Sequence, residues 1–314
     1  MMKALSVLIL GLLVCSCSIN KMAMKSVSDA LTGSGSSDVF TGDSDPELVG
    51  DALPFAIKMY ESLLASNPKH EGLIITTGSL FIMYANAFVQ GPAEMLPSSQ
   101  YDQREQAKQR SKHLYLRGAA ILYGGLDAKY PGFSGGYQGG TFDSYLAKMK
   151  KADTPLLYWA VAGILSAYSL DPMDLSLGVK IPELTAMMNR AYELDPDFNE
   201  GALDDFYILF YGSLPESMGG DKNLAKTHFE RCLEKTHGLS ASPYLSYVQS
   251  IAIPAQDYET FRAYLEKALA INPDENPSNR LVNIISQRKA RYLLENPENY
   301  FLDLDSDDDW EGDE

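Results

Sequence analysis

Apolar residues recur at spacings of three and four along nearly the whole chain from residue 46 onward, and no segment sustains an alternation of apolar and polar residues. The first spacing marks one face of an α-helix, whereas alternation would indicate a half-buried strand. The pattern therefore predicts an all-α fold. The expected helices span residues 46–67, 71–90, 101–130, 153–170, 180–195, 199–213, 221–236, 243–253, 257–272 and 277–295.

Several expected helices end at an Asn-Pro or Asp-Pro pair, and these endings share more than the proline. Ala191 and Ala268 each stand five positions before it, which is the closing pattern of the second helix of a tetratricopeptide repeat. Cys232 takes the corresponding place in a match without the proline, and the segment ending at Pro68 departs by having a leucine there. We expect degenerate tetratricopeptide-like helix pairs stacked into an α-solenoid, with a concave surface and a central cavity or pore.

Residues 1–16 have the features of a signal peptide: Lys3 supplies a positive charge, and an apolar stretch follows that is too short to span a bilayer. The stretch ends in Val-Cys-Ser-Cys, which resembles a bacterial lipobox. Cys17 is the better candidate for lipidation because Ser16 is small, whereas Cys15 would require cleavage after the bulkier Val14. The alternative is an ordinary secreted protein with incidental cysteines.

The remaining chain divides by composition. Residues 17–45 are rich in Ser, Gly, Thr and Asp, which predicts a flexible tether after the lipidated cysteine. Residues 46–302 form the expected helical domain, and residues 303–314 form an acidic tail that we expect to be disordered. Cys232 is the one cysteine left beyond the lipobox, so we expect no intramolecular disulfide and a buried thiol.

The net charge of −16 disfavours nucleic acid and anionic lipid headgroups as partners. Membrane contact is therefore expected through the lipid anchor only.

Catalytic motifs are missing from the sequence. It has no Gly-x-Ser-x-Gly element, and its four histidines fall at no metal-ligand spacing. Asp204 and Asp205 are adjacent in a predicted helix, where neighbouring side chains point about 100° apart, so they are not expected to form a facing acid–base pair. We expect no enzyme activity, no cofactor and no metal, although an active site assembled from distant residues is an alternative.

Three segments of the expected helices are apolar almost all round and rich in aromatic residues, and the chain has 19 Tyr against 12 Phe and 2 Trp. Such segments form ordinary core or line an apolar cavity, where tyrosine adds a hydroxyl that can orient a ligand. The candidate ligand-binding residues are Tyr84, Phe88, Tyr158, Trp159, Phe206, Phe210 and Tyr211, with Met218 in a tight loop near the mouth of the cavity.

One long run is specific to a family. Residues 201–221, GALDDFYILFYGSLPESMGGD, are similar to the T-component (TatT-like) lipoproteins of tripartite ATP-independent periplasmic (TRAP) transporters. The resemblance continues in residues 77–96, 225–232 and 242–294 and covers roughly 46–302. It implies a helical repeat protein outside the cytoplasmic membrane, a homotrimer, association with the substrate-binding P component, and a pore or cavity for an apolar or amphipathic small molecule. The acidic tail departs from the family.

Two functions follow as hypotheses. The first is a non-catalytic accessory lipoprotein of TRAP-type solute uptake in the cell envelope, facing the periplasm, that binds an organic ligand, docks the P component, or does both. The alternative is a tetratricopeptide-like envelope scaffold whose concave face binds only proteins.

Overall fold

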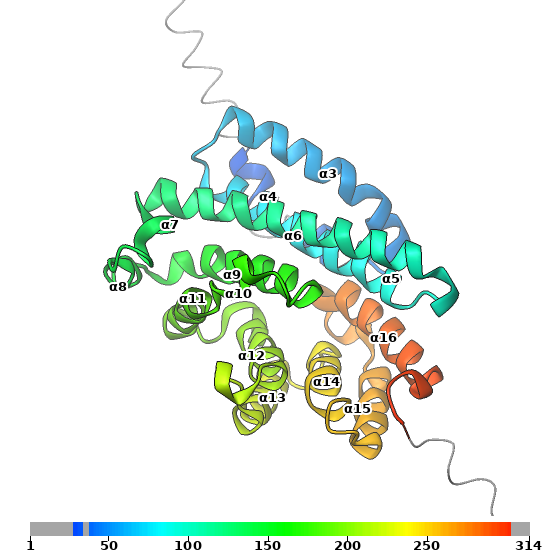
Figure 1. Ribbon diagram of the computed structural model, residues 1–314. Coiled ribbons are helices and arrows are strands. Elements are labelled where there is room, and N and C mark those ends of the chain that lie inside the picture. The colour runs from blue at the N-terminus through cyan, green and yellow to red at the C-terminus, as the bar shows by residue number, and fades with distance from the viewer. Residues whose placement is uncertain (1–27, 34–37, 303–314) are drawn as a thin grey trace, which may run out of the picture. The chain divides into compact units, whose positions relative to one another are not determined.

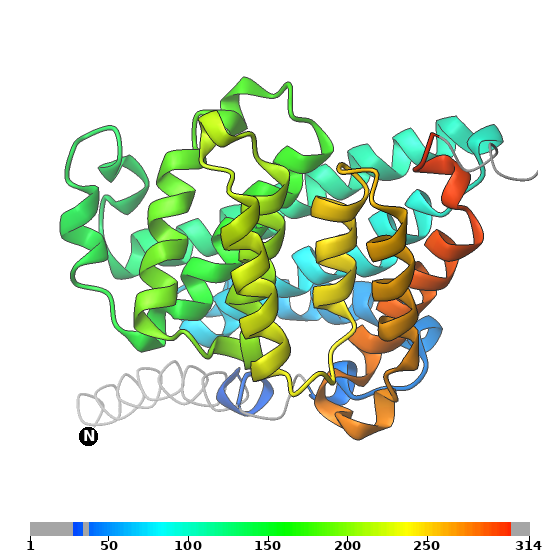
Figure 2. The ribbon, with the colours of Figure 1, turned by 90° about the horizontal axis from the view of Figure 1, so that it is seen from below.

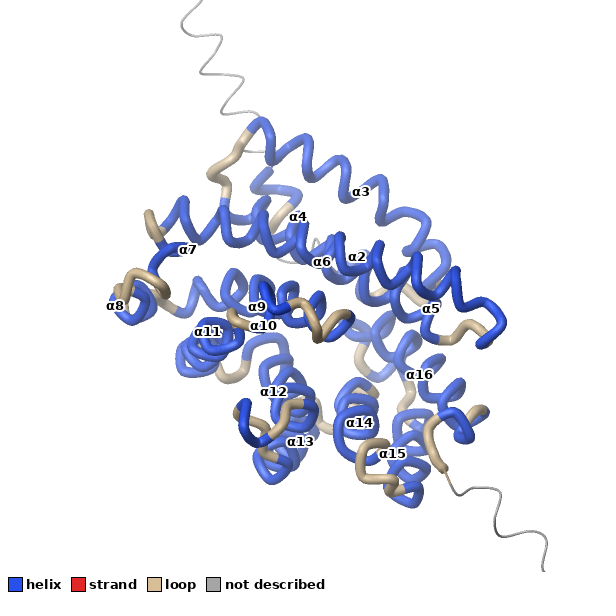
Figure 3. Tube along the Cα trace, in the orientation of Figure 1, coloured by secondary structure: helices blue, strands red, loops and turns tan. Residues whose placement is uncertain are grey.

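The computed structural model of the protein describes residues 28–33 and 38–302, and every regular element in these ranges is a helix (Figure 3). The all-α prediction is confirmed. The signal peptide, Cys17 and the acidic tail lie outside the described residues. Within the segment expected to form the tether, residues 28–31 are helical and α2 spans Asp38–Thr41.

The longer helices follow the expected ranges closely, because their ends coincide with the proline pairs and the breaks in apolar periodicity. They are α3 (Pro46–Ser66), α4 (Glu71–Tyr84), α6 (Tyr101–Lys129), α9 (Thr154–Leu170), α11 (Ile181–Leu194), α12 (Ala202–Ser213), α13 (Lys222–Lys235), α15 (Tyr258–Ala270) and α16 (Arg280–Glu295). The shorter α-helices are α5 (Gly91–Glu94), α7 (Phe133–Gly136), α8 (Phe142–Leu146), α10 (Leu175–Gly178) and α14 (Ser242–Tyr247). Two π-helical segments, η1 (Ala85–Gln90) and η6 (Val248–Ala252), continue α4 and α14.

The chain folds into two compact units. Unit 1 holds the described residues up to Val39, Gly50–Gln90 and Glu105–Met187. Unit 2 holds Phe40–Val49, Gly91–Arg104 and the chain from Met188 onward.

Unit 1 is built on close contacts among α4, α6 and α9, in which α6 runs antiparallel to both of the other helices (Figure 1). Glycines allow the approach: a Cβ at Gly118 of α6 would lie 2.6 Å from the carbonyl oxygen of Gly78 of α4, and one at Gly163 of α9 would lie 2.9 Å from Ile82. Gly125, further along α6, faces Ile74, which is earlier in α4, so the two helices run in opposite directions. A side chain at Gly118 would clash with the backbone of α4, so this glycine allows the close approach of the two helices.

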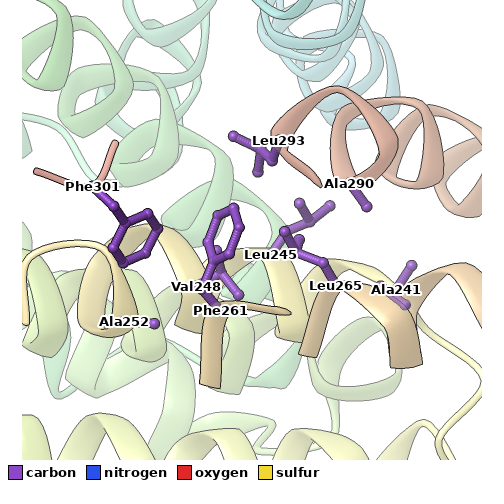
Figure 4. Packing of buried hydrophobic residues seen from close by; sticks show 10 residues of the cluster. Ala241, Leu245, Val248, Ala252, Phe261, Leu265, Ala290, Leu293 and Phe301 are labelled. Carbon is purple, nitrogen blue, oxygen red and sulfur yellow. The ribbon is translucent and has the colours of Figure 1, made fainter. Parts of the chain in front are cut away.

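Unit 2 contains the helix pairs α12–α13 and α15–α16, and Figure 2 shows α12 to α15 side by side. Its largest described core cluster joins α14, α15 and α16 through Phe261, Leu265, Ala290, Leu293 and Phe301, among others (Figure 4). Cys232 is buried in a neighbouring cluster with Ile208 and Phe229, so the expectation of a buried thiol is confirmed.

Within the described part of the chain, one helical run, Glu71–Glu94, is long and apolar enough to cross a membrane. Of its most apolar window, 56% is buried inside the protein.

Candidate functional site

The aromatic residues singled out in the sequence lie in three groups, two in unit 1 and one in unit 2. The groups are Tyr84 with Phe88 at the junction of α4 and η1, Tyr158 with Trp159 in α9, and Phe206 with Phe210 and Tyr211 in α12. Ring contacts join the residues within each group.

Tyr84 and Phe88 stack where α4 widens into the π-helix. Their ring centroids are 6.1 Å apart, the ring planes differ by 26°, and both side chains are half-buried. Arg110 of α6 lies over the Tyr84 ring, 5.6 Å from its centroid, and Nη2 donates a hydrogen bond of 3.3 Å to the Tyr84 hydroxyl. These contacts bring two rings, a hydroxyl and a cation together at one corner of unit 1. Single π-helical turns, such as the one that carries Phe88, occur frequently at functional sites.

Phe88 fits here because α3 has no side chain at Gly50. A Cβ at that position would lie 2.7 Å from Phe88 Cδ1. Gly50 thus leaves the space that the Phe88 ring occupies, although it makes no side-chain contact of its own.

A hollow of about 540 Å³ lies along the face of α6 that carries Arg110. The hollow is open, because its lining residues all lie on one face of α6, and the apolar parts of those residues supply nearly all of its surface. The lining residues are Glu105, Gln106, Gln109, Arg110, His113 and Leu114.

Tyr158 and Trp159 make an edge-to-face contact, with centroids 5.0 Å apart and planes at 80°. Both are half-buried, while their neighbours Leu157 and Ala160 are fully buried. The pair therefore lies at the border of the unit 1 core.

The rings of α12 belong to a larger aromatic assembly than the sequence indicated. Phe206 and Phe210 stack at 5.7 Å, and Phe210 is buried. The sequence analysis missed Tyr207, which stacks on Tyr211 at 5.2 Å and on His228 of α13 at 4.7 Å. His228 is one of the four histidines that fall at no metal-ligand spacing, and its contact with α12 depends on the pairing of α12 with α13.

Asp204 is a fully buried carboxylate that joins three helices. Its Oδ1 is 2.6 Å from His228 Nδ1 and accepts a hydrogen bond of 3.1 Å from the Tyr192 hydroxyl, and its Oδ2 is 2.8 Å from Lys235 Nζ. Burial alone would raise the pKa of Asp204, but the hydrogen bonds from His228 and Lys235 outweigh burial and lower the pKa. Asp204 is therefore a charged structural tie between α11, α12 and α13.

Asp205 has a different environment. Its Oδ2 accepts a hydrogen bond of 2.5 Å from the Ser242 hydroxyl, and its buried Oδ1 has no hydrogen-bond partner. Burial raises the pKa of this carboxyl. The expectation that the two adjacent aspartates do not face each other is confirmed, because they bind different helices.

Met218 lies in the loop between α12 and α13, in the 3₁₀ turn η5 (Glu216–Met218), and is 42% exposed. The loop is tight, as expected: the amides of Met218 and Gly220 both donate to the Pro215 carbonyl. Gly219 has φ +97°, and a Cβ at Gly220 would lie 1.8 Å from the Leu214 carbonyl oxygen. Gly219 and Gly220, which both belong to the family-specific run, are thus required by the backbone conformation of this loop.

A fourth aromatic group was not found from the sequence. Tyr244, Tyr247 and Tyr264 surround Phe229, with centroids 4.9 to 5.6 Å from it, and are half-buried. These residues are scattered over α13, α14 and α15, so only the pairing of the helices brings them together.

Metal-binding geometry is absent from the described residues, which contain no group of three or more His, Cys, Asp or Glu side chains able to hold an ion.

Comparisons with known proteins agree with the family resemblance of residues 201–221. The family model described as TRAP transporter T-component matches residues 42–301. A protein of Treponema pallidum (strain Nichols), described only as an uncharacterized protein, is 35% identical over 307 residues, covering 93% of this chain and 95% of its own length. The chain belongs to the TRAP transporter T-component family.

Proposed function

We propose that this protein is a lipid-anchored, periplasm-facing accessory of a TRAP-type uptake system that binds one apolar or amphipathic organic molecule and docks the substrate-binding P component. The family match over residues 42–301 carries the proposal, because it assigns the folded body to transporter accessories. The lipobox at Cys17 supports the anchor. The protein acts by holding and passing on a molecule, and it does no chemistry on it.

The best-supported ligand site is the corner formed by Tyr84, Phe88 and Arg110 with the adjoining hollow along α6. The two rings supply apolar area at low cost in side-chain entropy, and the Arg110 guanidinium and Tyr84 hydroxyl supply directional contacts. Tyr158 and Trp159 are a further candidate contact in unit 1, and the rings of α12 with Met218 form a separate candidate in unit 2.

The helix pairs also support stacked tetratricopeptide-like repeats. The small residue expected at the close of each second helix, at Ala191, Cys232 and Ala268, is at most 1% exposed. Close packing of two helices at such positions is the reason a repeat requires a small side chain there. The α-solenoid, its central cavity or pore and a trimeric assembly belong to the proposal.

Protein purified from its own cells is expected to release a small apolar or amphipathic molecule on denaturation, detected by mass spectrometry. Phe88→Ala and Arg110→Ala should each lower the released amount about tenfold, since each removes a ring or a polar contact worth roughly 1–2 kcal/mol. Gly50→Ala should also lower it, because the new methyl group displaces the Phe88 ring.

Phe55→Ala is the matched control, because Phe55 is 76% exposed on α3 of the same unit. Its release should equal that of the unaltered protein. Equal release from all four variants would place the ligand elsewhere, and no release from any preparation would contradict ligand binding.

A further inference from the structure

Two separate clusters of buried apolar residues lie in unit 2. The first joins α12 to α13 through Ile208, Phe229 and Cys232. The second joins α14, α15 and α16 and is the cluster shown in Figure 4. The half-buried Tyr244 and Tyr264 pack against both clusters from α14 and α15. The buried apolar core is therefore interrupted between the α12–α13 pair and the helices that follow it.

A row of small and polar residues lies at this interruption, where α12 meets α14 and η6. Ser242, Ser246 and Ser250 follow one another at intervals of four, which places them on one helix face. The Ser250 hydroxyl donates a hydrogen bond of 3.3 Å to the Ile208 carbonyl of α12. A Cβ at Gly212 of α12 would lie 2.5 Å from Ser250 Oγ. We call the three serines and Gly212 the serine seam.

Asp205 of α12 lies at the opposite end of the serine seam from Gly212. Its Oδ2 accepts a hydrogen bond of 2.5 Å from Ser242, and its buried Oδ1 has no hydrogen-bond partner. Burial raises the pKa of Asp205, and the opposing effect of the Ser242 and Ser246 hydroxyls is smaller. The seam therefore favours a neutral carboxyl, because a buried charge with no counter-charge is costly.

The groups around Asp205 supply no such counter-charge. Asp204, on the same helix, is a like charge, and α13 contributes the buried, neutral thiol of Cys232. Lys235 of α13 pairs with Asp204 instead. The titratable residues of α14 are tyrosines, η6 has none, and Glu200, just before α12, is exposed. Ionisation of Asp205 thus places an uncompensated charge inside the seam.

We propose that the serine seam is the plane at which unit 2 opens, and that ionisation of Asp205 shifts the equilibrium towards an open state in which the α12–α13 pair separates from α14, α15 and α16. While Asp205 is protonated, it binds Ser242 without a buried charge, and the seam stays closed. Once Asp205 is ionised, opening exposes the carboxylate to water. The contacts that resist opening are weak, because a hydroxyl hydrogen bond stabilises a contact less than the burial of a large apolar side chain does.

The sign of the pH dependence follows from the raised pKa. A carboxyl whose pKa is raised by folding is fully compatible with the closed state below the folded pKa, and it opposes that state as the pH rises through this value. Opening therefore increases with pH. It also moves Tyr244 and Tyr264 away with α14 and α15, which uncovers the cluster that contains Cys232.

Cys232 is a natural reporter of this opening, because it is 1% exposed in the closed protein. The test measures how fast an alkylating reagent modifies Cys232 in the full mature chain, with the modified peptide quantified by mass spectrometry. Dividing this rate by the rate for the urea-unfolded chain at the same pH yields the open fraction and cancels the reactivity of the thiol itself. From about pH 5 to about pH 8, the open fraction should rise by up to about tenfold per pH unit above the folded pKa of Asp205.

Three variants locate the cause. Asp205→Asn should keep a constant open fraction over this range, because an amide does not titrate. Glu259→Gln removes an exposed carboxylate of α15 and should behave like the unaltered chain. Gly212→Ala should raise the open fraction about tenfold at every pH, because its methyl group pushes against Ser250. Ionisation of the Cys232 thiol adds opening only above about pH 8.5, and it does so equally in every variant.

Each part of the inference has a result that overturns it. An equal pH slope in Asp205→Asn and the unaltered chain overturns the role of Asp205. An open fraction in Gly212→Ala equal to that of the unaltered chain overturns the serine seam as the plane of opening. An open fraction no larger than the globally unfolded fraction, measured by urea titration at the same pH, would mean that Cys232 is reached only through complete unfolding, and the inference is then wrong.

Discussion

Replacing Gly220 with alanine is expected to lower the free energy of unfolding by about 3 kcal/mol or more, which is large for the addition of one methyl group. The new Cβ would lie 1.8 Å from the Leu214 carbonyl oxygen and 2.6 Å from the Leu214 carbonyl carbon. Both are backbone atoms of the same tight loop, so no side-chain rotation relieves the clash. Urea unfolding followed by circular dichroism measures the change.

Gly219→Ala is the matched control, one position away. Gly219 has φ +97°, but a Cβ there would meet nothing within 4 Å. The cost is then backbone strain alone, roughly 1–2 kcal/mol. Equal losses for the two variants would show that the loop between α12 and α13 adapts, and that the glycines of the family-specific run are not explained by packing.

Asp204→Asn is expected to destabilise the protein by about 3 kcal/mol near neutral pH, because it removes the buried counter-charge of Lys235 and weakens the short contact with His228. Asp205→Asn should have the opposite sign and stabilise it by about 1 kcal/mol. Asp205 is a buried carboxylate with one unpartnered oxygen, and a neutral amide costs less to bury.

The pH dependence distinguishes the two aspartates further. The pKa of Asp204 is lowered by folding, so its stabilisation is complete above the unfolded value of about 3.9 and is lost as the pH falls through the folded pKa. The pKa of Asp205 is raised, so its cost is complete above the folded pKa and disappears as the pH falls to about 3.9.

As the pH falls, the loss of unfolding free energy in Asp204→Asn and the gain in Asp205→Asn should therefore both become smaller. Unfolding free energies from pH 7 down to pH 3 measure them. Two variants that change stability in the same direction at neutral pH would contradict the assignment of a paired and an unpaired carboxylate.

Helix positions could be predicted because they depend on local signals. The range 101–130 corresponds to α6 (Tyr101–Lys129), and 153–170 to α9 (Thr154–Leu170), since apolar periodicity and proline mark these ends. The π-helical turn at Ala85–Gln90 was not predicted, because widening a helix by one residue leaves the apolar pattern almost unchanged.

The site was harder to predict because its contacts join distant segments. Tyr84 and Phe88 were found from composition, but Arg110, 26 residues after Tyr84, was not, because its position over the ring depends on how α4 and α6 pack. The contacts of Asp204 with His228 and Lys235 could not be predicted for the same reason, since they depend on how α12 and α13 pack. Exposure was also beyond the sequence, since no pattern marks Leu175, which is 78% exposed.

The proposed docking is tested most directly by calorimetric titration of the unaltered mature protein with the purified P component of a TRAP transporter from the same organism. We expect saturable binding with a dissociation constant in the micromolar range or below. No measurable heat, together with no co-sedimentation of the two purified proteins, would contradict it.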